Sequence, residues 1–87
     1  MKNIYVVMGS TGEYSDRTEW AVIAYHDETA AQEHVVNAER RAKEIYATRE
    51  NHYRAEKGIN EFDTDMSMDY TGTFYFIYTV PLAKKKR

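Results

Sequence analysis

The sequence contains no cysteine and only one proline among its 87 residues. Without cysteine no disulfide can stabilise the chain, and the absence fits a reducing compartment. A chain this short buries only roughly 60–65% of its extended surface on folding, so its stability has to come from a well-packed core or from oligomerisation. Aromatic residues are abundant in compensation, with eight Tyr, three Phe and one Trp.

Strong net charge and long apolar runs are also missing. The net charge of −2 argues against generic binding to polyanions. The apolar run 4–8 is too short for a signal peptide, and no run approaches the ~20 apolar residues of a membrane span. We therefore expect a cytoplasmic protein without membrane contact. We assign residues 1–82 to a single domain and 83–87 to a basic flexible tail. Such a terminal tail is more often solvated than bound to phosphates, so nucleic acid is not the partner we expect.

Three segments rich in β-branched and aromatic residues predict strands at 3–8, 18–26 and 70–80. Residues 28–57 contain no Pro or Gly and predict one long helix, with Asp27 as its N-cap and Gly58 as its C′ residue. Such a helix is about 45 Å long and a strand about 27 Å, so it either overhangs the sheet or breaks near 48–51. The fold class is α+β, with ββαβ order, the first strand central, and the helix on one face.

Strict alternation along the three strands places apolar side chains on both faces of the sheet. The first strand offers Ile4, Val6 and Met8 on one side against Tyr5 and Val7 on the other. The second offers Trp20, Val22 and Ala24 against Ala21, Ile23 and Tyr25, and the third Phe74, Phe76, Tyr78 and Val80 against Tyr75 and Ile77. One helix covers only one face, so the sequence predicts a partner surface, most simply in a homodimer.

Several stretches are similar to a known group of proteins. They are the first strand, the loop 12–17, Trp20, the junction 24–28 and the closing Val80-Pro81-Leu82. In these the chain resembles short proteins encoded by tailed phages and prophages. The resemblance implies a ββαβ domain and a viral origin, with no defined activity. It also implies an accessory factor that binds host machinery in the host cytoplasm, as anti-CRISPR and other anti-defence proteins do.

Two groups of side chains are candidates for contact with a partner or ligand. The first lies in the long loop expected at 9–17, where glycine amides could meet a phosphate or carboxylate beside Arg17. The second consists of helix bases. The candidate residues are Tyr14, Ser15, Asp16, Arg17, Arg40 and Arg41. The alternative reading is a hairpin loop braced by Asp16 and Arg17, and a helix face covered by salt bridges.

The segment 61–69 contains four acidic residues and no base. We expect either a solvated connector or an acidic patch offered to a basic partner, formed by Glu61, Asp63, Asp65 and Asp69. Its spacing resembles a calcium loop, but Met68 and Phe74 replace the required Gly and Glu, so no metal is expected. The three histidines are scattered and are expected to be solvated or to lie at an edge, without binding a metal.

No cofactor is expected. Catalysis by a nucleophile needs a base beside it, and the spacing of residues in the sequence indicates no such pair, so we predict that the protein is not an enzyme. The sequence favours a homodimeric binding protein that inhibits a host protein. One alternative is a small-ligand sponge that holds a nucleotide-type signal between subunits, through Tyr14, Arg17 and the helix bases. The other is a protein that binds nucleic acid weakly through its basic tail.

Overall fold

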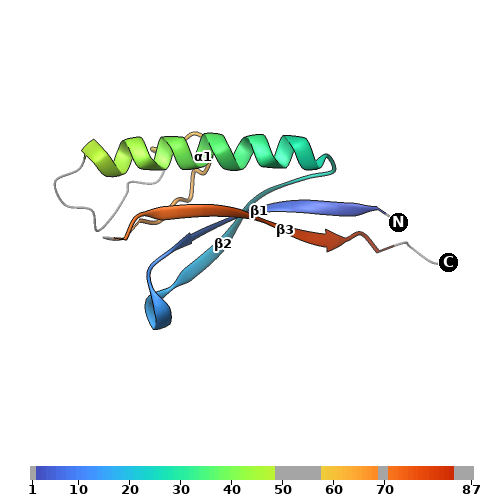
Figure 1. The fold of residues 1–87 in the computed structure, drawn as a ribbon, viewed down its shortest axis with the longest axis horizontal. Helices are drawn as coiled ribbons and strands as arrows, with labels where there is room; N and C mark the ends of the chain where they lie inside the picture. Colours follow the sequence, from blue (N-terminus) through green and yellow to red (C-terminus); the bar gives the residue numbers. More distant parts are fainter. Residues whose placement is uncertain (1, 49–57, 69–70, 84–87) are drawn as a thin grey trace.

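The computed structural model describes residues 2–48, 58–68 and 71–83 (Figure 1). Strand β1 spans Asn3–Thr11, the short 3-10 helix η1 spans Tyr14–Asp16, and strand β2 spans Thr18–Tyr25. Helix α1 spans Glu28–Thr48 and strand β3 spans Thr73–Pro81. The predicted ββαβ order and α+β class are confirmed.

The three strands form one antiparallel sheet in the order β2-β1-β3, with β1 in the centre as predicted. Helix α1 lies along one face of this sheet (Figure 1). The Tyr75 backbone N–H, on edge strand β3, donates to Oε2 of Glu39 at 3.0 Å. A helix carboxylate thus occupies a backbone donor that an edge strand would otherwise offer to another strand.

Helix α1 begins where the sequence predicts. Oδ1 of Asp27 accepts from the Thr29 backbone N–H at 3.2 Å, the geometry of an N-cap. The helix buries Ala31, Ala38, Ala42 and Ile45 against Val7 and Tyr75 of the sheet. The expected continuation over 49–57 lies outside the described residues, so the predicted cap at Gly58 is untested, although Gly58 does have a positive φ of 83°.

Strand β2 departs from the strict alternation expected of it. The pairing register with β1 shifts between Val7 and Met8, which leaves Val22 as an extra residue in a β-bulge. After the bulge the faces exchange, so Tyr25 packs on the core with Trp20, whereas Ala24 is exposed. The predicted placement of Ala24 with Trp20, and of Tyr25 on the other side, was therefore wrong.

The hairpin loop is shorter than expected, because β1 continues through Gly9, Ser10 and Thr11. Only residues 12–17 connect the strands, not 9–17. Gly12 makes the turn with a φ of 96°, and a Cβ there would lie 2.4 Å from the Asp16 carbonyl oxygen. The close approach explains why glycine stands at this position.

Candidate interaction surface

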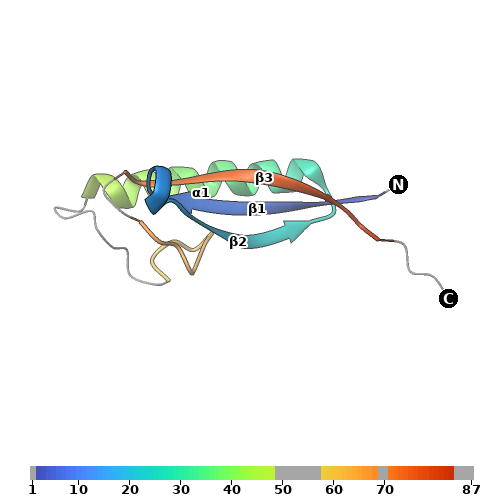
Figure 2. The ribbon, with the colours of Figure 1, turned by 90° about the horizontal axis from the view of Figure 1, so that it is seen from below.

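Among the described residues, one face of the sheet is covered by no helix along most of its length, and only the turn η1 projects on this side, at the hairpin end (Figure 1). Figures 1 and 2 show α1 on one side only, and in Figure 2 the strands lie in front of the helix. Val7 and Tyr75 face α1, so their neighbours along each strand face the other way. We call this surface the open face, and it consists of Ile4, Val6, Met8, Ala21, Ala24, Phe74, Phe76, Tyr78 and Val80.

The open face is apolar and partly exposed. Phe74 is 52% exposed and Tyr78 is 61% exposed, whereas Val6, Met8 and Phe76 are half-buried. None of these nine residues is charged, but the same register places Ser10 and the carboxylate of Glu19 on this face beside Phe74, at the hairpin end. The expectation of apolar side chains on both faces is thus met by the geometry, although the bulge changes which β2 residues contribute. An exposed apolar surface of this kind is typical of a protein-interaction site.

A buried carboxylate supports the sheet from the opposite side. Asp63 is only 3% exposed, and its Oδ2 accepts from Nε1–H of Trp20 at 2.9 Å and from the Tyr75 hydroxyl at 2.8 Å. Asp63 therefore joins β2, β3 and the connector 58–68, by which we mean the described part of the chain between α1 and β3. Three sequence-distant segments are fixed by one side chain.

The expected acidic patch is not formed as predicted. Asp63 lies in the core, and Asp69 lies outside the described residues. Glu61 and Asp65 are exposed, but Glu61 Oε1 is 3.2 Å from Nε of Arg41 and is partly neutralised. The prediction was wrong because the Asp63 carboxylate accepts from two buried donors, and a polar group with such partners can be buried in the core. The neighbouring residues in the sequence do not reveal these distant donors.

The connector is held down rather than solvated. Asn60 is fully buried, and its Nδ2 donates to the Ala38 carbonyl of α1 at 3.3 Å while its Oδ1 accepts from the Phe62 N–H at 2.9 Å. Met66 and Met68 are also buried. The prediction of a solvated connector was therefore wrong, because these residues complete the core at the hairpin end of β2.

His34 links the connector to β2 as well. Its Nε2 lies 2.7 Å from the Phe62 carbonyl oxygen, which can only accept, so Nε2 carries a proton. In the neutral ring Nδ1 then accepts from the Tyr25 hydroxyl at 2.8 Å. The prediction of a solvated histidine was wrong for His34. His26 is exposed as expected, and His52 lies outside the described residues.

The loop and helix candidates are not brought together in one chain. Tyr14 begins η1, and Ser15 and Asp16 are exposed. Arg40 and Arg41 belong to helix α1. Figure 1 shows the turn of η1 on the side of the sheet away from this helix. The loop and the helix bases are therefore separated by the sheet.

The cations also have carboxylate partners. Arg17 pairs with Glu19 at 2.9 Å. Arg41 pairs with Glu44 and Glu61, each at 3.2 Å. Arg40 is exposed. Because Arg17 and Arg41 are already neutralised, an anion would have to displace carboxylates to reach either guanidinium.

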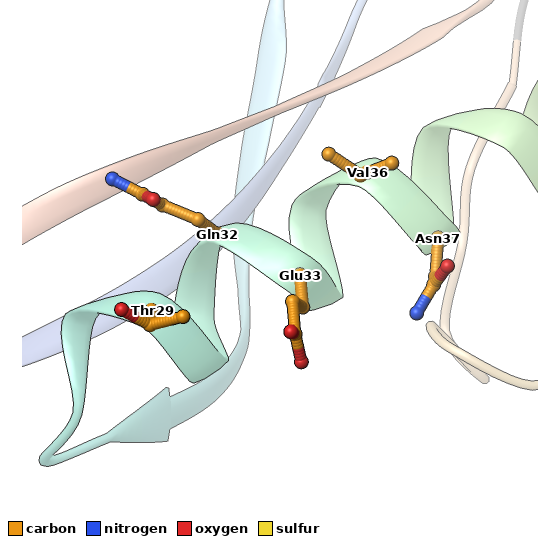
Figure 3. Close-up of a pocket in the computed structure, with 5 residues that line it drawn as sticks. All are labelled: Thr29, Gln32, Glu33, Val36 and Asn37. Atoms are coloured by element: carbon orange, nitrogen blue, oxygen red, sulfur yellow. The ribbon is translucent and has the colours of Figure 1, made fainter.

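A hollow on the outside of α1 does not resemble an enclosed ligand site. Its lining residues are Thr29, Gln32, Glu33, Val36 and Asn37. All of them come from α1, and Figure 3 shows Gln32 and Glu33 pointing in different directions. Ligand sites usually combine an apolar cavity with polar groups that converge from several elements. This hollow lacks that arrangement.

We searched the described residues for a metal-binding group and for a nucleophile beside a base. Within them, no three His, Cys, Asp or Glu side chains form a group that could hold a metal. Ser10 pairs with Glu19 at the hairpin end of β2, whereas His26 follows Tyr25 at the other end, roughly 20 Å along the strand. A Ser10–His26 pair is thus excluded by distance. No helix in the described part of the chain is long and apolar enough to span a membrane.

The Tyr75 phenol provides a pH test of the core. Burial, the hydrogen bond to Asp63, and the negative charges of Asp63 and Glu39 raise the pKa of Tyr75 far above its ordinary value of 10.0. The neutral phenol is thus favoured by folding, and this stability is fully present below about pH 10 and is lost as the pH rises further. In an alkaline titration followed by tyrosine absorbance and circular dichroism, we expect a late ionisation that coincides with unfolding and disappears in Tyr75→Phe. Ionisation of every tyrosine near pH 10 with the fold intact would contradict this.

Comparison with models of known protein families, with curated proteins and with solved structures gave no match.

Proposed function

We propose that this chain is a non-enzymatic binding protein and that the open face is its protein-interaction surface. The observation behind the proposal is the exposure of Phe74 and Tyr78 within a continuous apolar surface built from all three strands. Aromatic side chains bury large areas at low entropic cost, and they are enriched among the residues that dominate binding energy.

The support behind the open face suits it to this role. β1 pairs with β3 along its whole length, from Asn3↔Pro81 to Thr11↔Thr73. On its other side it pairs with β2 from Tyr5 to Thr11. Behind the sheet, Tyr75 is fixed by Asp63 and Glu39. A surface that is held in place before binding loses little conformational entropy when a partner docks.

A macromolecular partner fits this surface better than a small ligand does. A sheet face is broad and lacks the concave shape of a ligand pocket. The alternative of a nucleotide sponge relies on Arg17 and helix bases, but Arg17 and Arg41 are paired with carboxylates. Inhibition of a host defence protein in the host cytoplasm is a further proposal that rests on the phage resemblance of the sequence.

Photo-crosslinking tests the proposed surface. A photoreactive phenylalanine analogue replaces Tyr78 in one variant and Val36, on the outer side of α1, in another. Tyr78 and Val36 are both 61% exposed, so they are matched in access to solvent. In cells that express the full chain, we expect covalent protein adducts from position 78 and none from position 36. Equal yields at both positions, or no adduct at 78, would overturn the proposal.

A further inference from the structure

We infer that the open face is covered by a second copy of the chain, packed face to face about a two-fold axis parallel to β1. This inference rests on the proposed function, because it names the partner of the same surface. It is carried by the relief of the open face, by the absence of charge in its two central rows and by its size.

Large and small side chains lie on opposite sides of the open face. Each row across the sheet runs from β2 through β1 to β3. One row is Ala21, Met8 and Phe76, and the next is Ala24, Val6 and Tyr78. In both rows the β2 residue is alanine and the β3 residue is a large aromatic. Over these two rows the face therefore has a ridge along β3 and a shallow depression along β2.

A two-fold axis parallel to β1 makes this relief self-complementary. The rotation leaves each row at its own level and exchanges the two edges, so β2 of the partner copy lies over β3. Phe76 then meets Ala21 of the partner copy, and Tyr78 meets Ala24 of the partner copy. Met8 and Val6 lie near the axis. An axis perpendicular to the strands would instead set the aromatic ridges against each other and the alanines against alanines, which leaves unfilled space.

The electrostatics of the open face agree with a second copy. Its two central rows carry no charged side chain, so two copies can be apposed there without burying an unpaired charge. At its hairpin end, Glu19 is in the same row as Ser10 and Phe74, and Arg17 pairs with this carboxylate at 2.9 Å. A net charge of −2 on each chain produces little repulsion.

The size of the open face predicts a reversible dimer. Three strands with about nine residues each have a flat footprint of roughly 14 by 30 Å. Two such faces and their protruding aromatics bury about 1,000–1,200 Å² in total, the lower end of the range for specific interfaces. Leu82, which is 45% exposed just beyond β3, is available to extend the contact. We therefore expect association that depends on concentration.

Two single variants and their mixture test both the dimer and its axis. The wild-type protein is expected to show twice the 10.2 kDa mass of one chain in light scattering at high concentration. Ala21→Glu and Phe76→Lys are each expected to reduce this to the single-chain mass. Mixed in equal amounts they are expected to restore the dimer mass, because the carboxylate introduced at position 21 of one copy faces the ammonium introduced at position 76 of the other. Val36→Lys, on α1, is the control and is expected to remain dimeric. Circular dichroism checks that each variant is folded, and exposed Ala21 tolerates the change even if Phe76→Lys does not.

Three results would overturn the inference. They are a wild-type mass of one chain at every concentration, single variants that remain dimeric, and folded monomeric variants whose mixture stays monomeric. The first result, together with crosslinking from position 78 to a different protein, would leave the proposed function standing. The same result without any adduct at 78 would remove both.

Discussion

Replacing Asp63 with alanine is expected to lower the free energy of unfolding by about 3–5 kcal/mol. The substitution leaves the Trp20 indole N–H and the Tyr75 hydroxyl without the carboxylate oxygen that accepts from both. Each donor would lose a charge-assisted hydrogen bond, worth about 1.5–3 kcal/mol. A domain of this size has a total stability of roughly 4–13 kcal/mol, so the variant is expected to be close to unfolding.

Urea denaturation followed by circular dichroism measures this loss. Asp63→Asn is the matched control, because its amide oxygen can still accept from both donors while the charge is removed. We expect it to cost about 1–2 kcal/mol, well below the alanine variant. Equal losses for alanine and asparagine would show that charge, and not the acceptor, is what the core requires at this position.

Gly9→Ala is the second substitution with a large expected effect, about 2–3 kcal/mol. A Cβ at position 9 would lie 2.6 Å from Cε2 of Trp20, a distance that real Cβ atoms do not show. The indole cannot simply move aside, since its Nε1 is bound to Asp63 at 2.9 Å. Gly9 is not among the glycines with positive φ, so the cost comes from the ring and not from the backbone.

Thermal unfolding and tryptophan fluorescence check this expectation, because Trp20 is the only tryptophan and reports directly on the displaced ring. Gly58→Ala is the control, since its φ of 83° strains an alanine while no atom lies within 4 Å of the added Cβ. It is expected to cost about 1 kcal/mol with unchanged fluorescence. If both alanine variants lose the same stability, contact with the indole is not the cause.

These two positions lie behind the open face, which connects stability to the proposed function. Trp20 and Tyr75 face α1, and their strand neighbours Ala21, Phe74 and Phe76 belong to the open face. A change that displaces the buried rings alters β2 and β3 at the positions that would meet the partner. Binding variants should therefore be chosen on the open face itself, where Ala21 and Tyr78 are exposed.

The sequence by itself determined the order of elements, the start of α1 at Asp27 and the apolar character of both sheet faces. These follow from local patterns, because strand and helix periodicity and N-capping involve residues only a few positions apart. The apolar surplus also follows, since one helix cannot cover two faces.

Only the tertiary structure decided where Asp63, His34 and the residues after the bulge are placed. Asp63 lies 43 residues from Trp20 and 12 from Tyr75 in the chain, and no local pattern pairs them. The extra residue at Val22 exchanges the faces of Ala24 and Tyr25 through the register with β1. A polar side chain is stable inside a protein only if distant partners satisfy it, and those partners are defined by the packing of the whole fold.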